Sequence, residues 1–375
     1  KKLYFFFDFG LMELSTYFPE KTSLRKESVP LEIIYCQQCK LFQLNHNYEL
    51  KKLFNEDYGY RSGINKSMKD HFQTIINDIK KKIKLNKDDI FLDIASNDGT
   101  LLSMIKKSGL KKVGIDPTIN KYKKFYKKDI KTSTKFFSSK NYLELDKSKV
   151  KLITSIAVFY DVHNPNLFVK DVSKIIKNDG IWILEQSYLP SIIKNLAFDS
   201  ICHEHVTYFT HKQLEVILNK NNLKVIDCSL NTMNGGSIRF FIVPKESNLK
   251  SNRANINKIK KFENTFYKNL NKKLNQFKQK IIDNKTKIMR ILKKLKAQGK
   301  KIHVYGASTK GNILLQYFNI DNKIIDFAAD RNKFKWTKKM PGTNIPIISE
   351  KKSRNLNPDY YLVLPWHFKK EFIKR

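Results

Sequence analysis

The chain has 375 residues, of which 41% are hydrophobic, and this is enough for two or three packed domains. Its formal net charge is +37, yet only eight of its 72 basic residues are Arg, the side chain that reads bases and phosphates through paired hydrogen bonds. Because the Lys residues are spread along the whole chain, we expect a solvated basic surface and no specific nucleic-acid site. No apolar run approaches the roughly 20 residues that a membrane span needs.

Four cysteines in so long a chain argue against a disulfide framework and favour the reducing cytoplasm. Cys36 and Cys39 form one CxxC pair, which is half of a four-cysteine zinc site, and Cys202 and Cys228 lie far from it in sequence. The aromatic start carries Asp8 and no cleavage pattern follows it, so we expect no signal peptide. Since the chain begins with Lys, we expect that upstream residues are missing.

The first two thirds of the chain predict a lobe of short strands followed by an α/β domain. Strand-like pieces surround the CxxC pair in residues 1–63, and apolar spacing predicts a helix over 64–84. Strands and helical stretches then alternate, which indicates a parallel doubly wound sheet. The strands are expected at DIFLDIA (89–95), KKVGID (111–116), VKLITSIAVFY (150–160) and GIWILEQSY (180–188). LKVIDCSLN and GSIRFFIVP flank a Gly-rich turn and predict a closing β-hairpin.

The last third predicts a helical connector and a second α/β unit. Residues 248–299 are rich in Lys and Asn and place apolar residues at helical spacing, as in one long helix or a helix pair. From residue 300 onward, KIHVYGA, KIIDFAAD and DYYLVLPW are strand-like, and STKGNILLQYF is helical.

The turn in FLDIASNDGTLLSMI joins a strand to a helix and carries chemistry. Asp93 closes the strand, the turn presents backbone N–H groups at the helix start, and Asp116 ends the next strand, where it can bind ribose hydroxyls. The dinucleotide pattern G-x-G-x-x-G is absent. The stretch resembles the cofactor loop of class I S-adenosylmethionine-dependent methyltransferases, with Ala95, Asn97 and Gly99 at the three glycine positions. Asn tolerates left-handed backbone angles, although an ordinary tight turn remains the alternative.

Eight motifs, in chain order, extend this resemblance over the whole sequence. They are YGYRSGINKSM (58–68), LDIASNDGTLL (92–102), VFYD (158–161), EQSY (185–188), ICHEHVTYFT (201–210), NGGSIR (234–239), YGASTKGNILLQY (305–317) and PDYYLVLPWHF (358–368). Together they resemble the sugar C-methyltransferase family. The resemblance implies S-adenosylmethionine as cofactor, a structural zinc in the N-terminal lobe, and a nucleotide-linked 4-keto-6-deoxy sugar that is methylated on carbon.

The expected fold class is therefore α/β, with four parts. An N-terminal CxxC lobe (1–63) precedes a class I methyltransferase doubly wound sheet with a closing antiparallel hairpin (64–247). A helical connector (248–299) leads to a C-terminal Rossmann-like substrate domain (300–375). The sequence does not predict the oligomeric state or the identity of the sugar.

His203, Glu204 and His205 form a triplet for which three interpretations are open. The zinc-protease motif H-E-x-x-H is absent. The two His could share a face of an extended strand and bind metal, or they could be a satisfied buried pair. The resemblance implies proton transfer, with His205 as the base and Glu204 orienting the site. It also places Tyr58 or, preferably, Tyr60 at the reaction centre.

The resemblance also implies which residues bind the cofactor and which bind the substrate. For the cofactor it implies Asp93, Ala95, Ser96, Asn97, Gly99, Asp116, Pro117, Phe159 and Asp161. For the substrate it implies Asn234, Arg239, Tyr305, Ser308, Lys310, Trp366 and His367. Two positions depart from many relatives, which carry Tyr in place of Cys202 and, in some, His in place of Asp161.

Three other functions stay open at this point. An O- or N-methyltransferase of another small molecule would share the cofactor loop. A basic nucleic-acid-binding protein would explain the charge, and a nicotinamide-dependent oxidoreductase would explain the turn YGASTKG alone.

Overall fold

The computed structural model describes residues 2–16, 18, 28–55, 58–366 and 369–373. They form two compact units. We call residues 65–191 with 207–269 the central unit, and residues 1–64, 192–206 and 270–375 the composite unit. Each is described by itself.

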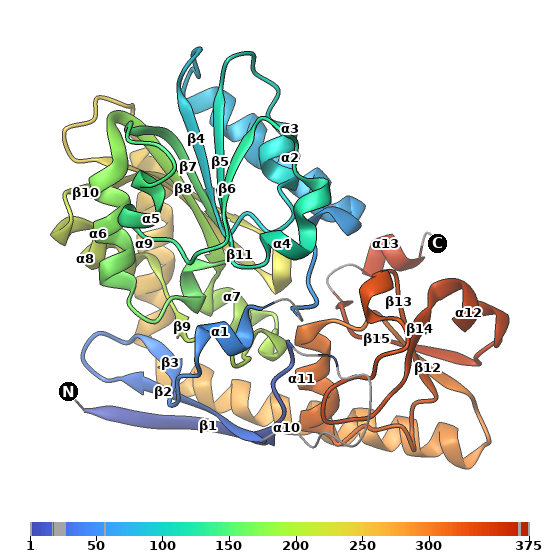
Figure 1. Ribbon diagram of the computed structural model, residues 1–375. Helices are drawn as coiled ribbons and strands as arrows, with labels where there is room; N and C mark the ends of the chain where they lie inside the picture. Colours follow the sequence, from blue (N-terminus) through green and yellow to red (C-terminus); the bar gives the residue numbers. More distant parts are fainter. Residues whose placement is uncertain (1, 17, 19–27, 56–57, 367–368, 374–375) are drawn as a thin grey trace. The chain divides into compact units, whose positions relative to one another are not determined.

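The central unit is built on a seven-stranded sheet (Figure 1). Its strands are β4 (Ile90–Ile94), β5 (Lys111–Ile115), β6 (Ile130–Ser133), β7 (Val150–Ile156), β8 (Ile176–Ser187), β10 (Leu223–Asn231) and β11 (Ser237–Pro244). The order is β10-β11-β8-β7-β4-β5-β6, and only β11 runs antiparallel to both of its neighbours. The doubly wound sheet and the closing hairpin are therefore confirmed, with β6 as a strand that the sequence did not predict.

Helices cover both faces of this sheet (Figure 1). One face carries α2 (Lys66–Lys82), α3 (Thr100–Met104) and α4 (Ile119–Tyr122), and the other α5 (Ser139–Leu143), α6 (Pro165–Ile175), α8 (His211–Lys220) and α9 (Arg253–Lys268). The apolar stripe of α2 explains its docking, because Phe72, Ile75 and Ile79 are buried in a core shared with α3. The short β9 (Thr207–Tyr208) precedes α8, and α7 (Leu189–Lys194) leads out of β8.

The N-terminal part of the composite unit is an antiparallel arrangement of β1 (Leu3–Met12), β2 (Val29–Cys36) and β3 (Phe42–Leu44), followed by α1 (Leu50–Leu53). Its C-terminal part is a parallel sheet in the order β14-β13-β12-β15. These strands are β12 (Ile302–Tyr305), β13 (Phe327–Asp330), β14 (Ile347–Ser349) and β15 (Tyr360–Val363). α11 (Thr309–Phe318) joins β12 to β13, α12 (Glu350–Asn355) joins β14 to β15, and α13 (Lys369–Ile373) follows β15, while a short 3₁₀ helix (Lys333–Lys335) lies between β13 and β14.

The expected connector consists of two helices, α9 in the central unit and α10 (Leu270–Ala297) in the composite unit. Within the composite unit, aromatic rings join segments that are far apart in sequence. Phe9 of β1 packs against Phe198 and Tyr317, with ring centroids 6.4 and 5.2 Å apart. Gln316 and Glu13 add a reciprocal pair of hydrogen bonds. The segment 192–206 is thereby held between the N-terminal strands and α11.

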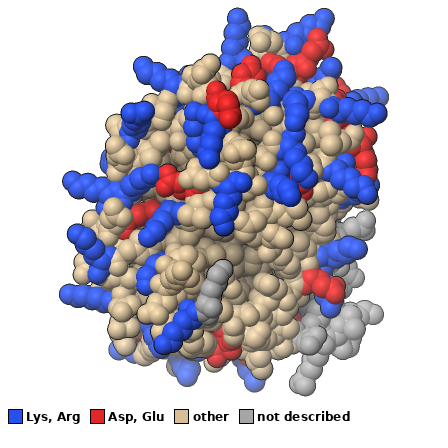
Figure 2. Space-filling view, turned by 90° about the vertical axis from the view of Figure 1, so that its left-hand side faces the viewer, with Lys and Arg blue, Asp and Glu red and all other residues tan. Residues whose placement is uncertain are grey.

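Basic side chains are scattered over the face in Figure 2, with acidic side chains interspersed and no single cluster. Among the described residues, no helix combines the length and apolarity that crossing a bilayer requires.

Candidate functional site

The turn after β4 has three left-handed residues at alternate positions. Ala95, Asn97 and Gly99 have φ angles of 59°, 51° and 70°. These are the three positions at which the resemblance places glycine. Left-handed φ costs little for Gly and is tolerated by Asn, but it is strained for Ala. The turn thus keeps the backbone shape of a glycine-rich loop with one glycine.

Asp116 holds this turn from the end of β5. Its Oδ2 accepts a hydrogen bond from the backbone N–H of Asn97 at 2.9 Å, and its Oδ1 accepts from the Thr118 backbone at 2.7 Å. Tyr126 lies over the turn, with its hydroxyl donating to the Asn97 carbonyl and 2.8 Å from the Ser96 hydroxyl. The acid predicted at this strand end therefore fixes the shape of the loop.

Three acids give the turn a negative character. Burial raises the pKa of Asp93 to about 7, against the hydrogen bond from Thr154, and the charges of Asp116 and Asp98 raise it further. Burial also raises the pKa of Asp116. A cofactor with sulfonium and ammonium groups fits this environment, because positive charge would relieve the repulsion among these carboxylates.

The remaining cofactor candidates lie in the same unit in different surroundings. Phe159 is fully buried and packs against the rings of Phe168, Trp182 and Phe209, so it belongs to the core. Asp161 is buried in the short helix that follows β7. Pro117 is half-buried beside Asp116. Their contact with cofactor stays a prediction.

The His-Glu-His triplet belongs to the composite unit and forms a turn. The backbone N–H of His205 donates to the Cys202 carbonyl at 3.1 Å, so the two His do not share a strand face. His205 Nδ1 is 2.7 Å from the carbonyl oxygen of Ser200. A carbonyl only accepts, so Nδ1 carries the proton and the imidazole lone pair is on Nε2. Burial lowers the pKa of His205 to about 3, and the charge of Lys310 acts in the same direction.

The Glu204 side chain is buried and lies beside Ser15. Its side chain is 4% exposed, and Oε2 accepts a long hydrogen bond from the Ser15 hydroxyl at 3.4 Å. Burial raises its pKa, while the Cys202 thiol and Lys310 act against this rise. Cys202 is itself buried, so the position where relatives carry Tyr here holds a small partner of Glu204.

His203 has surroundings distinct from those of His205. Its ring meets Tyr48 edge-on at 5.2 Å, and burial lowers its pKa to about 4, which the carbonyls of Val29 and Pro30 offset only in part. Among the described residues, no three His, Cys, Asp or Glu side chains are grouped as metal ligands. The structure therefore gives the metal interpretation of the triplet no support.

Two side chains of the C-terminal domain reach the triplet segment. Lys310 Nζ donates to the Ser200 hydroxyl at 3.1 Å, and the Trp366 indole N–H donates to Asp199 at 3.2 Å. Ser308 caps α11 by accepting from the Gly311 N–H, while Tyr305 packs against Tyr361. The structure thus brings Lys310 and Trp366 together with His205 inside one unit. His367 lies outside the described residues.

The YGYRSG segment is anchored to the same domain. The Asn332 amide donates to the Gly59 carbonyl at 3.0 Å. The buried Lys335 donates to the Ala307 carbonyl at 2.5 Å and lies 4.4 Å from the centre of the Phe18 ring. Tyr58 is half-buried and Tyr60 is 38% exposed, so the preference for Tyr60 over Tyr58 stays a prediction.

Two families of known proteins match parts of this chain. Residues 65–227 match the family described as "Methyltransferase domain", and residues 232–375 match "C-methyltransferase C-terminal domain". C-methyltransferase NovU of Streptomyces niveus is 27% identical over 346 residues, which are 92% of this chain and 82% of that protein.

The chain is an S-adenosylmethionine-dependent methyltransferase. These matches support the resemblance to C-methyltransferases that the motifs indicate.

Two solved structures similar to this methyltransferase are those of magnesium protoporphyrin IX methyltransferase from Synechocystis PCC 6803, with bound SAH, and of an S-adenosylmethionine-dependent methyltransferase from Clostridium acetobutylicum ATCC 824. They cover 49% and 46% of this chain and 90% of each matched chain, at 10% and 14% identity, with TM-scores of 0.38 and 0.36. Because these scores are low, the fold assignment rests on the strand order of the central unit.

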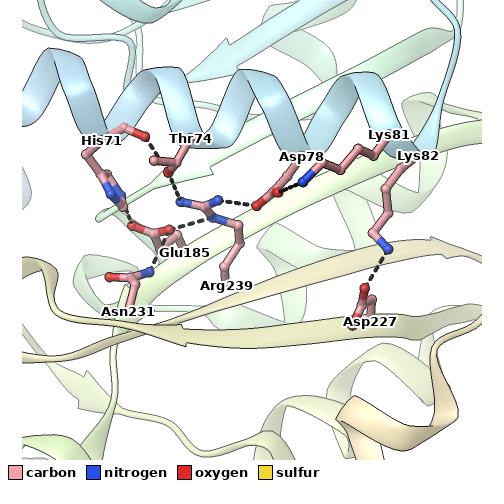
Figure 3. A network of polar contacts seen from close by, with 9 residues as sticks. All are labelled: His71, Thr74, Asp78, Lys81, Lys82, Glu185, Asp227, Asn231 and Arg239. Carbon is pink, nitrogen blue, oxygen red and sulfur yellow. Dashed lines mark hydrogen bonds and ion pairs between the residues drawn. The ribbon is translucent and has the colours of Figure 1, made fainter.

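Arg239 of the methyltransferase is engaged in a buried network (Figure 3). Its Nε donates to Glu185 at 2.7 Å, Nη1 to Asp78 at 2.6 Å and Nη2 to Thr74 at 3.1 Å. His71 contacts the other oxygen of Glu185 at 2.5 Å. The guanidinium therefore joins α2 to the sheet, and its assignment to substrate stays a prediction. Asn234 lies in the hairpin turn with a left-handed φ of 53°.

The CxxC pair of the methyltransferase lies at the end of β2, with Cys36 buried and Cys39 exposed. Burial raises the pKa of Cys39, and the neighbouring Cys36 raises it further. These two thiols are fewer than the four ligands of a structural zinc site. Zinc is thus not supported by the described part of the chain.

Sequence reasoning missed several side chains around these sites: Ser15, Tyr126, Thr154, Asp199, Ser200 and Lys335. None of them is part of a sequence motif that predicts a functional site. Only Asp199 and Ser200 carry a signal, since they stand next to ICHEHVTYFT.

Proposed function

We propose that this methyltransferase transfers a methyl group to a carbon next to the ketone of a nucleotide-linked 4-keto-6-deoxy sugar, with His205 as general base. The observation that carries the proposal is the hydrogen bond between His205 Nδ1 and the Ser200 carbonyl at 2.7 Å. It orients the ring and sets the tautomer that a base needs, with the lone pair on Nε2. Residues 232–375 support carbon as the acceptor through their match to a C-methyltransferase domain.

The chemistry of a ketone makes this reaction accessible to a histidine. A C–H bond beside a carbonyl is far more acidic than an ordinary sugar C–H bond, because its electron pair can enter a C=C bond while the carbonyl oxygen takes the charge. His205 Nε2 takes up the proton, and Nδ1–H stays bound to Ser200. When bound, S-adenosylmethionine supplies an electrophilic methyl group to the enolate carbon and leaves as neutral S-adenosylhomocysteine. The ketone is thereby restored.

Other residues of the chain have supporting tasks in this proposal. The turn of Ala95, Asn97 and Gly99, together with Asp93 and Asp116, holds the cofactor. Glu204 orients the reaction centre, and the C-terminal domain receives the nucleotide sugar. Burial keeps the imidazole neutral and excludes water that would compete for the proton.

The test uses cofactor with a ¹³C-labelled methyl group and a panel of nucleotide 4-keto-6-deoxy sugars, with NMR to locate the methyl group in the product. Matched 4-hydroxy sugars are the control, since they lack the acidic C–H bond. We expect a new C–C bond next to the ketone and no transfer to the controls. A methyl group on oxygen or nitrogen, as in the alternative O- or N-methyltransferase, would overturn the proposal.

A further inference from the structure

Lys310 occupies a position that helix energetics disfavours. It lies in the first turn of α11, whose N-cap is Ser308 and which has no acidic residue in that turn. The N-terminus of a helix carries partial positive charge, so a cation there is destabilising. The side chain is directed to the triplet segment, where Nζ donates to the Ser200 hydroxyl at 3.1 Å.

Ser200 links this ammonium to the base. Its hydroxyl accepts from Lys310, and its carbonyl accepts from His205 at 2.7 Å. Lys310 also interacts electrostatically with Asp199 and Glu204, whose pKa values burial raises and whose charged forms the ammonium favours. The ammonium of Lys310 thus interacts with several buried groups close to His205, the proposed base.

We propose that Lys310 is a catalytic residue whose ammonium stabilises the negative oxygen of the enolate when His205 removes the proton. The inference rests on the proposed function. The balance of the step requires such a group: the C–H electron pair moves into the C=C bond, the carbonyl π pair moves onto oxygen, and the proton goes to His205 Nε2. The oxygen is bonded to the carbon adjacent to the one that loses the proton, so it forms close to the base, and Lys310 is linked to the base through Ser200.

The state of His205 makes this stabilisation necessary. An imidazole whose pKa burial lowers to about 3 is a weak base. It removes a carbon-bound proton only if the developing oxyanion is held strongly at the same time. The positive end of α11 adds to the field of Lys310, so the arrangement that is unfavourable for the resting helix becomes favourable for the charged intermediate.

A simpler role for Lys310 is to bind the phosphates of the nucleotide, and kinetics separates the two. Binding of a ground-state phosphate affects KM with kcat unchanged, whereas an interaction formed with the enolate affects kcat. The readout is exchange of the acidic hydrogen in deuterated water, with S-adenosylhomocysteine present, so that proton removal is followed without methyl transfer.

The variants are Lys310→Met, Lys310→Arg and Ser200→Ala, with Lys323→Met as the charge-matched control. Lys323 is exposed in the turn after the far end of α11. We expect Lys310→Met to lower the exchange rate at saturation by about 10²- to 10³-fold, as for loss of one oxyanion donor. Lys310→Arg should recover part of the rate. Ser200→Ala should have a smaller effect because it keeps the carbonyl that holds His205, and Lys323→Met should have none.

Circular dichroism and the thermal unfolding midpoint check that each variant is folded. If the wild-type protein exchanges the hydrogen and Lys310→Met does so at the same saturated rate with a higher KM, Lys310 binds substrate and the inference is wrong while the proposed function holds. If the wild-type protein exchanges no keto-sugar hydrogen, both the proposed function and this inference are wrong.

Discussion

Asp116 and Asp330 make the same kind of hydrogen bond in two different sheets, because each carboxylate accepts a backbone N–H from the turn after the neighbouring strand. Asp116 follows β5 and accepts from the Asn97 N–H at 2.9 Å, and Asp330 ends β13 and accepts from the Ala307 N–H at 2.8 Å. In both cases an acid at the end of the second strand fixes the turn that follows the first strand. The two turns belong to separate units, so the same device supports two sites that can be tested independently.

This relationship predicts opposite outcomes for two matched variants. Asp116→Asn should weaken S-adenosylmethionine binding by at least about tenfold, because an amide nitrogen cannot accept the loop N–H groups and a buried donor is left unsatisfied. Asp330→Asn should leave cofactor affinity within about twofold and lower activity on the keto sugar. Calorimetry with the cofactor measures the first effect. Equal loss of cofactor affinity in both variants would contradict the separation.

Asp93 predicts a pH dependence of stability in the absence of cofactor. Its pKa of about 7 lies above the ordinary value of 3.8, so between these pH values the folded protein keeps a proton that the unfolded chain has released. Stability therefore falls as the pH rises through this window. Asp93→Asn removes this penalty and can still accept from Thr154. We expect its thermal unfolding midpoint to exceed that of the wild type at pH 8, with the difference vanishing near pH 4.

The two histidines of the triplet should respond differently to the same substitution. His205→Gln should lower hydrogen exchange and methyl transfer by about 10²- to 10⁴-fold, as for loss of a general base. His203→Gln is the control, because that ring packs against Tyr48, and exchange should persist. Since the pKa of His205 is about 3, the wild-type kcat/KM profile should show no acid limb near pH 6.5. An acid limb near pH 6.5 that disappears in His205→Gln would contradict this prediction, because it would show that the pKa of the base is well above 3.

The network of Figure 3 predicts that Arg239 acts mainly on stability. Arg239→Met leaves Glu185 and Asp78 without their shared cation and should cost about 3 kcal/mol of unfolding free energy, as for breaking a buried ion pair. Arg253→Met, on an exposed helix start, is the control. Chemical denaturation measures the difference. Unchanged stability with a raised KM for the sugar would instead assign Arg239 to the substrate, as the motif resemblance implies.

The parts of this molecule that the sequence predicted are those encoded locally. Apolar runs predicted the buried strands β4, β7 and β8, and the tolerance of Asn for left-handed angles anticipated Asn97. The left-handed φ of Ala95 was indicated only by its place at a glycine position of the family resemblance, because alanine itself does not favour that conformation. β6, with only four residues, gave too short a pattern.

The environment of His205 could not be predicted, because its members are distant in sequence. Lys310 meets Ser200 across 110 positions, and Ser15 meets Glu204 across 189. Each contact exists only after the fold is complete, and no spacing within the triplet encodes it. The motif resemblance supplied the role of His205, and the structure supplied the groups that set its tautomer and its charge.

The composite unit gathers three separate stretches of chain around the triplet, and this has a consequence for synthesis. Residues 192–206 need the N-terminal strands on one side and α11 on the other, and α11 emerges from the ribosome last. Closing such distant contacts is slow, and until then the aromatic rings of Phe9 and Phe198 lack their contacts with Tyr317 of α11. A nascent chain of this methyltransferase is therefore inactive until α11 has been made, and it is most exposed to aggregation just before that point.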